Sequence, residues 1–127
     1  MEEKNIYAFF YDVKTGVIQK LVYTVRKKRP GYYDGLTYYD CIEKDADFLW
    51  EETIFKSDMD VIKPVFLSKS SKKSYIPDEY KMYSFNGDID NFKSELRKEL
   101  NDSVKTYTET IKIMKNILSR IEKKGKK

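Results

Sequence analysis

Residues 5–26 read NIYAFFYDVKTGVIQKLVYTVR and predict two antiparallel strands joined by a tight turn. The segment Asn5–Tyr11 is rich in β-branched and aromatic residues, which favour strands. Both of its faces are apolar, so we expect a central strand that is covered on both sides. Asp12 opens the turn, and Gly16 supplies the left-handed residue of a bulged hairpin. The returning strand is expected over Val17–Arg26.

The segments after this hairpin predict more of the same sheet. Pro30 and Gly31 close the basic stretch 26–31, which predicts a loop there. Pro64 marks either an edge strand or the start of a strand. Further strands are expected at residues 36–42, 61–68 and 79–85, a short helix at 45–55 and a polar loop at 68–74. The predicted fold class is α+β, an antiparallel sheet meander with one short helix and a long C-terminal helix.

That long helix is predicted over residues 88–123, with Asp88 or Asp90 as its N-terminal cap. From Leu100 onward the apolar residues alternate in steps of four and three, which is the 3.5-residue period of a coiled coil. The predicted oligomer interface consists of Leu100, Val104, Tyr107, Ile111, Met114, Leu118 and Ile121. Two interpretations stay open, since the helix could lie across its own sheet or pair with another copy. The regular spacing favours the second.

The chain length and composition predict a single folded domain over residues 1–127. Residues 1–87 are expected to be mainly β-sheet, followed by the helix at 88–123 and a basic tail at 124–127. Aromatic residues make up 15% of the chain, which argues against disorder. The single cysteine, Cys41, fits a reducing compartment. The sequence has no signal-peptide pattern and no apolar run long enough to span a membrane, so a cytoplasmic location is expected.

Catalytic and metal-binding motifs are missing from the sequence. It contains no histidine and one cysteine, which excludes Ser-His-Asp and Cys-His arrangements and zinc clusters. The five glycines are scattered and form no phosphate-binding loop. The acidic residues between Asp40 and Asp60 lack the order of a calcium loop. We therefore expect a protein that is not an enzyme and holds no metal or cofactor.

Tyrosines next to arginines form the best candidate binding site. A tyrosine ring can stack on a nucleobase or anchor a protein interface, and a neighbouring guanidinium can hold a phosphate. The candidate ligand- or partner-binding residues are Arg26, Arg29, Tyr32, Tyr33, Tyr38 and Tyr39. The alternative is that these rings only cover the sheet. Residues 93–127 carry 11 basic and 5 acidic side chains, so a nucleic-acid binder using this basic helix is a further possibility.

The layout of a small sheet followed by a long amphipathic helix, on a Lys-rich chain without histidine, resembles small phage counter-defence proteins. It is similar in outline to the Thoeris anti-defence sponges, which sequester cyclic ADP-ribose signals. This resemblance implies a homo-oligomer whose partner is a host protein or a nucleotide-derived small molecule. The expected function is a non-enzymatic inhibitor that self-associates through its C-terminal helix and blocks or sequesters a host defence factor. The alternative is a sponge for an anionic nucleotide-derived signal.

Overall fold

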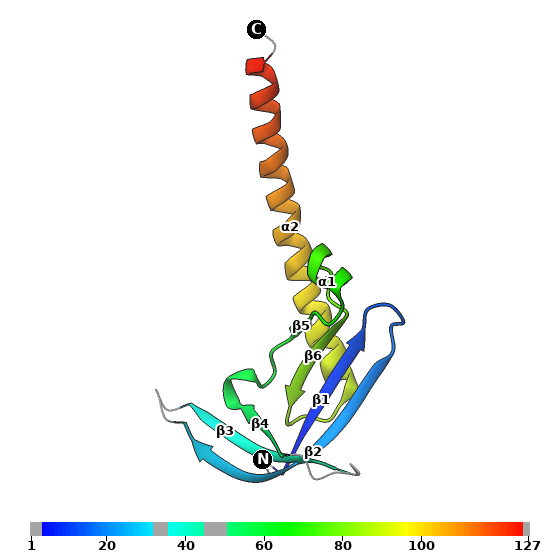
Figure 1. Cartoon of the computed structure of the whole chain (residues 1–127), viewed down its shortest axis with the longest axis vertical. Helices are drawn as coiled ribbons and strands as arrows, with labels where there is room; N and C mark the ends of the chain where they lie inside the picture. The colour runs from blue at the N-terminus through cyan, green and yellow to red at the C-terminus, as the bar shows by residue number, and fades with distance from the viewer. Residues whose placement is uncertain (1–3, 32–35, 45–50, 126–127) are drawn as a thin grey trace. The chain divides into compact units, whose positions relative to one another are not determined.

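The structure is a computed structural model that describes residues 4–31, 36–44 and 51–125, and the chain divides into two units, residues 1–95 and 96–127. The described residues form a six-stranded antiparallel sheet and a long C-terminal helix, which confirms the predicted α+β class (Figure 1). The strands are β1 (Asn5–Asp12), β2 (Ile18–Pro30), β3 (Thr37–Glu43), β4 (Glu51–Phe55), β5 (Lys63–Val65) and β6 (Glu79–Ser84). The helical elements are η1 (Lys56–Asp58), α1 (Lys69–Ser74) and α2 (Ile89–Gly125).

The strand order is β4-β3-β2-β1-β6-β5. Strands β1 to β3 form the predicted meander, and β4 extends it. Strand β6 then pairs with the free side of β1 and brings β5 to the other edge. The hairpin turn is built as predicted, because the Asp12 carboxylate accepts the N–H groups of Lys14 and Thr15, and Gly16 has a φ of 74°. Pro64 lies in the edge strand β5, also as predicted.

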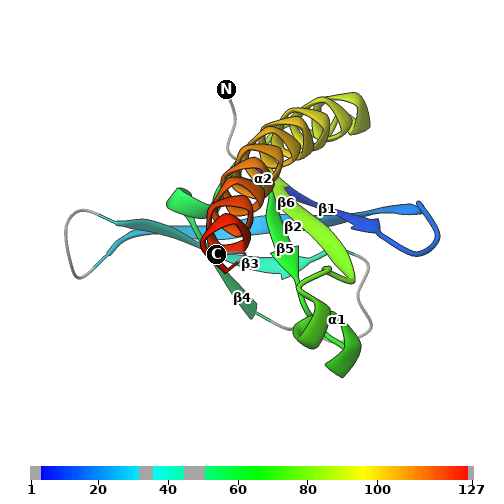
Figure 2. The same cartoon turned by 90° about the horizontal axis from the view of Figure 1, so that it is seen from above.

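Strand β2 is longer than predicted and extends to Pro30. The loop predicted for residues 26–31 is therefore wrong up to Pro30, because Lys27–Pro30 pair with Thr37–Asp40 of β3. The pairing register shifts between Val25 and Lys27, which places Arg26 in a bulge. A bulge bends a strand and increases its twist. Figure 1 shows β3 and β4 turned away from the direction of β1 and β6, and Figure 2 shows β2 running along most of the sheet.

Three other predicted elements differ in the structure. Residues 51–55 of the predicted short helix form strand β4, whereas residues 45–50 lie outside the described residues. The strand predicted at 61–68 is limited to β5. The predicted loop at 68–74 is wrong, because it contains helix α1. The Ser68 side chain caps this helix by accepting the N–H of Ser71 at 3.0 Å.

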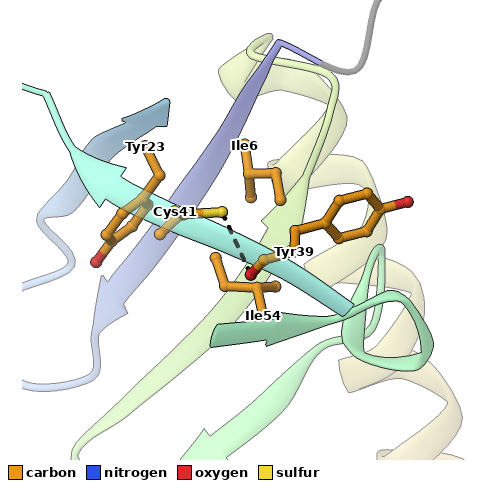
Figure 3. Packing of buried hydrophobic residues seen from close by; sticks show 6 residues of the cluster. Ile6, Tyr23, Tyr39, Cys41 and Ile54 are labelled. Carbon is orange, nitrogen blue, oxygen red and sulfur yellow. Dashed lines mark hydrogen bonds between the residues drawn. The ribbon is translucent and has the colours of Figure 1, made fainter. Parts of the chain in front are cut away.

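The sheet has a buried core on one face, made where β3 and β4 curl towards β1 (Figure 3). The core residues are Ile6, Ala8, Tyr23, Tyr39, Cys41 and Ile54. Tyr39 packs edge-on against Phe85, with 5.4 Å between ring centroids, and Tyr23 packs in the same way against Tyr83. These edge-to-face pairs are a favoured geometry of buried aromatic rings.

The opposite face of β1 is buried by the first turns of α2. Phe9 stacks on Phe92 with 5.1 Å between centroids, and both side chains are fully buried together with Met82. Helix α2 begins after Asp88, whose carboxylate accepts the N–H of Asp90 at 2.9 Å, as the predicted cap requires. Strand β1 is thus central and covered on both faces, which confirms the prediction from its apolar pattern.

Asp78 fixes the connection between β5 and α1. Its carboxylate accepts the backbone N–H groups of Leu67 and Ser68 and the hydroxyls of Ser68 and Ser71, at 2.6 to 3.1 Å. These hydrogen bonds, led by that of the Ser68 N–H, hold the pKa of Asp78 well below its ordinary value of 3.8. The carboxylate therefore stabilises the folded chain above that value, and this stabilisation is lost as the pH falls towards the lowered pKa.

We expect Asp78→Asn to unfold at a lower urea concentration than the wild type at pH 7. The difference between the two should narrow as the pH falls below about 4, because the wild-type contribution is lost there. Urea titrations between pH 7 and pH 2.5, followed by circular dichroism, measure this. Asp102→Asn, on the exposed surface of α2, is the control and should follow the wild type at every pH. A difference in unfolding midpoint between Asp78→Asn and the wild type that does not vary with pH would contradict the lowered pKa of Asp78.

Candidate functional site

The most prominent feature of the second unit is a row of exposed large apolar side chains along α2, called the apolar stripe below. Each member is 47% to 67% exposed. The stripe consists of Val104, Tyr107, Ile111, Ile113, Met114, Ile117, Leu118 and Ile121. It contains six of the seven residues of the predicted oligomer interface, and the seventh, Leu100, is half-buried. Two isoleucines, Ile113 and Ile117, add to the predicted set.

The helix that carries this stripe is uninterrupted. No glycine or proline occurs between Gly87 and Gly125, so nothing in the sequence breaks the helix. The hydroxyls of Thr106 and Thr110 donate to backbone carbonyls four residues earlier, at 3.1 and 3.0 Å. These threonines are thereby accommodated on the helix. The stripe is consequently presented along one continuous element.

A second candidate lies at the far end of β2 and β3, called the basic hollow below. It has a volume of about 330 Å³ and is lined by Lys27, Lys28, Arg29, Pro30, Gly31 and Tyr38. The Arg29 Nε donates to the Asp40 carboxylate at 2.7 Å, which orients the guanidinium. The Tyr38 ring lies 6.0 Å from the ring of Phe55 on β4, and Phe55 is 43% exposed. The hollow thus combines the cations Lys27 and Arg29 with the ring of Tyr38, whereas the Lys28 Nζ lies over the Tyr39 ring, 5.9 Å from its centroid.

The six predicted binding residues are distributed unevenly over this region. Arg29 and Tyr38 face each other across β2 and β3 and line the basic hollow. Arg26 is exposed in the bulge outside it, and Tyr39 is fully buried in the core. Tyr32 and Tyr33 lie outside the described residues. The prediction missed Lys27 and Lys28. Strict strand alternation from Val25 would place Lys27 on the core face, and only the bulge at Arg26 moves it to the face of Tyr38.

A third hollow of about 330 Å³ lies beside the end of β6, lined by Asp60, Ser84, Phe85, Asn86, Asn91 and Glu95. Ser84 is buried, and its hydroxyl donates to the Asp60 carboxylate at 2.5 Å while accepting the Asn86 N–H at 3.0 Å. Asp60 has a φ of 59° and donates its own N–H to the Tyr83 carbonyl. These polar groups are hydrogen-bonded to one another, so we assign them a structural role in stabilising the connection into α2.

The buried thiol and phenol of the core are poorly suited to nucleophilic or base chemistry. Burial, with smaller contributions from Asp40 and Glu52, raises the pKa of the Cys41 thiol to about 11. Its Sγ–H group donates to the Tyr39 carbonyl at 3.7 Å (Figure 3). Burial, and then Glu52, also raises the pKa of Tyr23. At neutral pH both groups stay protonated, whereas a nucleophilic cysteine acts as the thiolate.

Metal-binding and membrane-spanning features are not found in the described part of the chain. Its acidic residues and Cys41 form no group of three or more that could hold a metal ion. No helix among the described residues has the length and apolar content needed to cross a membrane. No protein-family model, curated protein or solved structure matches the chain.

Proposed function

We propose that this chain is a cytoplasmic, non-enzymatic binding protein that self-associates through the apolar stripe of α2. The observation that carries this proposal is the exposure of eight large apolar side chains on one helix. Exposed apolar patches of this extent mark interaction sites. The layout resemblance supplies the kind of partner, a host defence factor, and an oligomer would present several copies of the sheet unit to it.

The area of the stripe supports other copies of this chain as its occupants. A buried aliphatic side chain contributes about 2–3 kcal/mol at about 25 cal/mol/Å², which corresponds to roughly 100 Å² each. Eight such side chains offer about 800 Å² per chain, the area that each partner contributes to a standard stable interface. The stripe alone is therefore large enough for a stable homo-oligomer.

The residues that flank the first half of the seam are uncharged, which also allows two copies to pair. In the heptad, Val104, Ile111 and Leu118 occupy the a positions, and Leu100, Tyr107, Met114 and Ile121 occupy the d positions. The e and g positions between residues 101 and 110 are uncharged: Asn101, Ser103, Thr108 and Thr110. Like charges opposite one another would oppose pairing, and these positions bring none together.

The period of the stripe favours a partner helix over the chain's own sheet. A 3.5-residue period matches a supercoiled partner helix, whereas packing on a sheet does not require it.

Multi-angle light scattering of the purified chain tests this proposal directly. We expect a mass that is a multiple of 15.2 kDa at micromolar concentration. A monomer across the micromolar range would overturn self-association.

The basic hollow supports a second candidate function, the binding of an anionic nucleotide. Its volume of about 330 Å³ lies at the lower end of the range for small-ligand pockets. Tyr38, with Phe55 beside it, supplies a ring on which a base can stack, and Lys27 and Arg29 supply positive charge for a phosphate. Asp40 offsets part of this charge through its ion pair with Arg29.

This candidate predicts opposite effects for two neighbouring substitutions. Tyr38→Ala should weaken the binding of adenosine monophosphate by about 1–3 kcal/mol, because the stacking surface is lost. Asp40→Asn should strengthen it, because a negative charge leaves the site. Isothermal titration calorimetry with the mononucleotide, inorganic phosphate and a short single-stranded oligonucleotide compares the ligand sources. Lys56→Ala, an exposed lysine outside the hollow, is the control. No heat with any of the three ligands would remove this candidate.

A further inference from the structure

The apolar stripe changes width along α2. At 100° per residue, Leu100, Val104 and Tyr107 fall within an arc of about 60° of the helix circumference. Between residues 111 and 121, called the distal segment below, the six apolar residues span about 160°. The five polar residues of that segment, Lys112, Lys115, Asn116, Ser119 and Arg120, all lie in the other half. All six apolar residues are 47% to 60% exposed.

An arc of this width contains two adjacent seams. Ile111, Met114, Leu118 and Ile121 form the a/d seam of an ordinary two-stranded coiled coil. Ile113 and Ile117 lie outside that seam, at positions c and g, and form a second one with Met114 and Ile121. In a two-stranded coiled coil the a/d stripe forms the buried seam, so Ile113 at position c would stay in water and Ile117 at position g would be covered only in part.

We infer that α2 contacts two neighbouring helices through its distal segment, so that the assembly is a ring of at least three copies. This inference rests on the proposed self-association. A closed ring in which each helix has two neighbours requires three or more chains. Lys115 and Arg120 border the two sides of the arc, and their long side chains can reach water from the rim of such a bundle. The occupant of both seams is therefore the same helix from other copies of this chain.

The double substitution Ile113→Lys with Ile117→Lys tests the second seam. We expect sedimentation velocity and native mass spectrometry to give at least three times 15.2 kDa for the wild type. The double variant should fall to a dimer or a monomer. The matched control, Asn116→Lys with Ser119→Lys, adds the same two charges on the polar half and should keep the wild-type mass.

The masses of the wild type and the double variant together decide whether the ring exists. A wild-type dimer would overturn the ring and leave the proposed self-association intact, whereas a wild-type monomer would overturn both. A double variant that keeps the wild-type mass would also overturn the second seam. The wild-type mass distinguishes a ring from a dimer even if the double variant loses helicity in circular dichroism.

Discussion

Replacing Phe92 with alanine is expected to lower the free energy of unfolding of the sheet unit by about 3–5 kcal/mol. Phe92 is fully buried and stacks on Phe9 with an interplanar angle of 12°. Phe9 pairs with Met82 across β1 and β6, so the Phe92 ring covers the middle of this face of the central strand. Truncation would leave a cavity beside two fully buried side chains. Equilibrium unfolding in guanidinium chloride measures the change.

Phe55→Ala is the matched control for this substitution, because it removes the same ring from a surface position. Phe55 is 43% exposed and contacts Tyr38 at the end of the sheet. We expect Phe55→Ala to lower the free energy of unfolding by less than half as much as Phe92→Ala does. Equal losses of unfolding free energy for the two variants would show that the packing of Phe92 on Phe9 does not stabilise the sheet unit.

The sequence predicts β1 and α2 best, because the apolar pattern of each is enough by itself to indicate the type of element. Strand β1 has apolar residues on both faces, and the structure buries Ile6 and Ala8 on one face and Phe9 on the other. Helix α2 runs without glycine or proline and is capped by Asp88, so its bounds agree with the prediction to within two residues. In both cases local chemistry and tertiary packing favour the same structure.

The elements that were mispredicted depend on partners distant in sequence. Lys27–Pro30 look like a charged loop, yet they extend β2 because β3 lies beside them. Residues 51–55 become β4 because Ile54 enters the core opposite Tyr39. The pairing of β6 with β1 joins residues that are 67 to 77 positions apart, and no local pattern encodes it.

The sequence predicts the apolar stripe better than the basic hollow, because the hollow also depends on residues that are distant in sequence. The apolar stripe could be identified from spacing alone, since all its members lie on one helix. The basic hollow brings residues of β2 and β3 together, so its membership depends on strand register. Tyr38 and Tyr39 are neighbours in sequence, but a strand sends them to opposite faces. Assigning both to one site required the register, which only the structure gives.

Replacing Ile111 and Leu118 together with aspartate is expected to dissociate the assembly to monomers. Both residues occupy a positions of the seam and are more than half exposed in the single chain. Loss of each buried aliphatic side chain costs about 2–5 kcal/mol. A buried, unpaired carboxylate adds a further penalty. The combined loss of at least about 4 kcal/mol weakens association by roughly a thousandfold or more. Light scattering over a concentration series measures it.

The variant Ile111→Asp with Leu118→Asp also distinguishes the two possible partners of the helix, which are another copy of the chain and the chain's own sheet. If the seam packs on another copy, the sheet unit keeps its guanidinium midpoint while the mass falls. If the sheet itself were the partner, the midpoint would fall, and the loss would approach that of Phe92→Ala. Asn116→Asp with Ser119→Asp places the same two charges on the polar half of α2 and should change neither quantity. An unchanged mass for Ile111→Asp with Leu118→Asp would show that the heptad spacing of α2 does not mediate assembly.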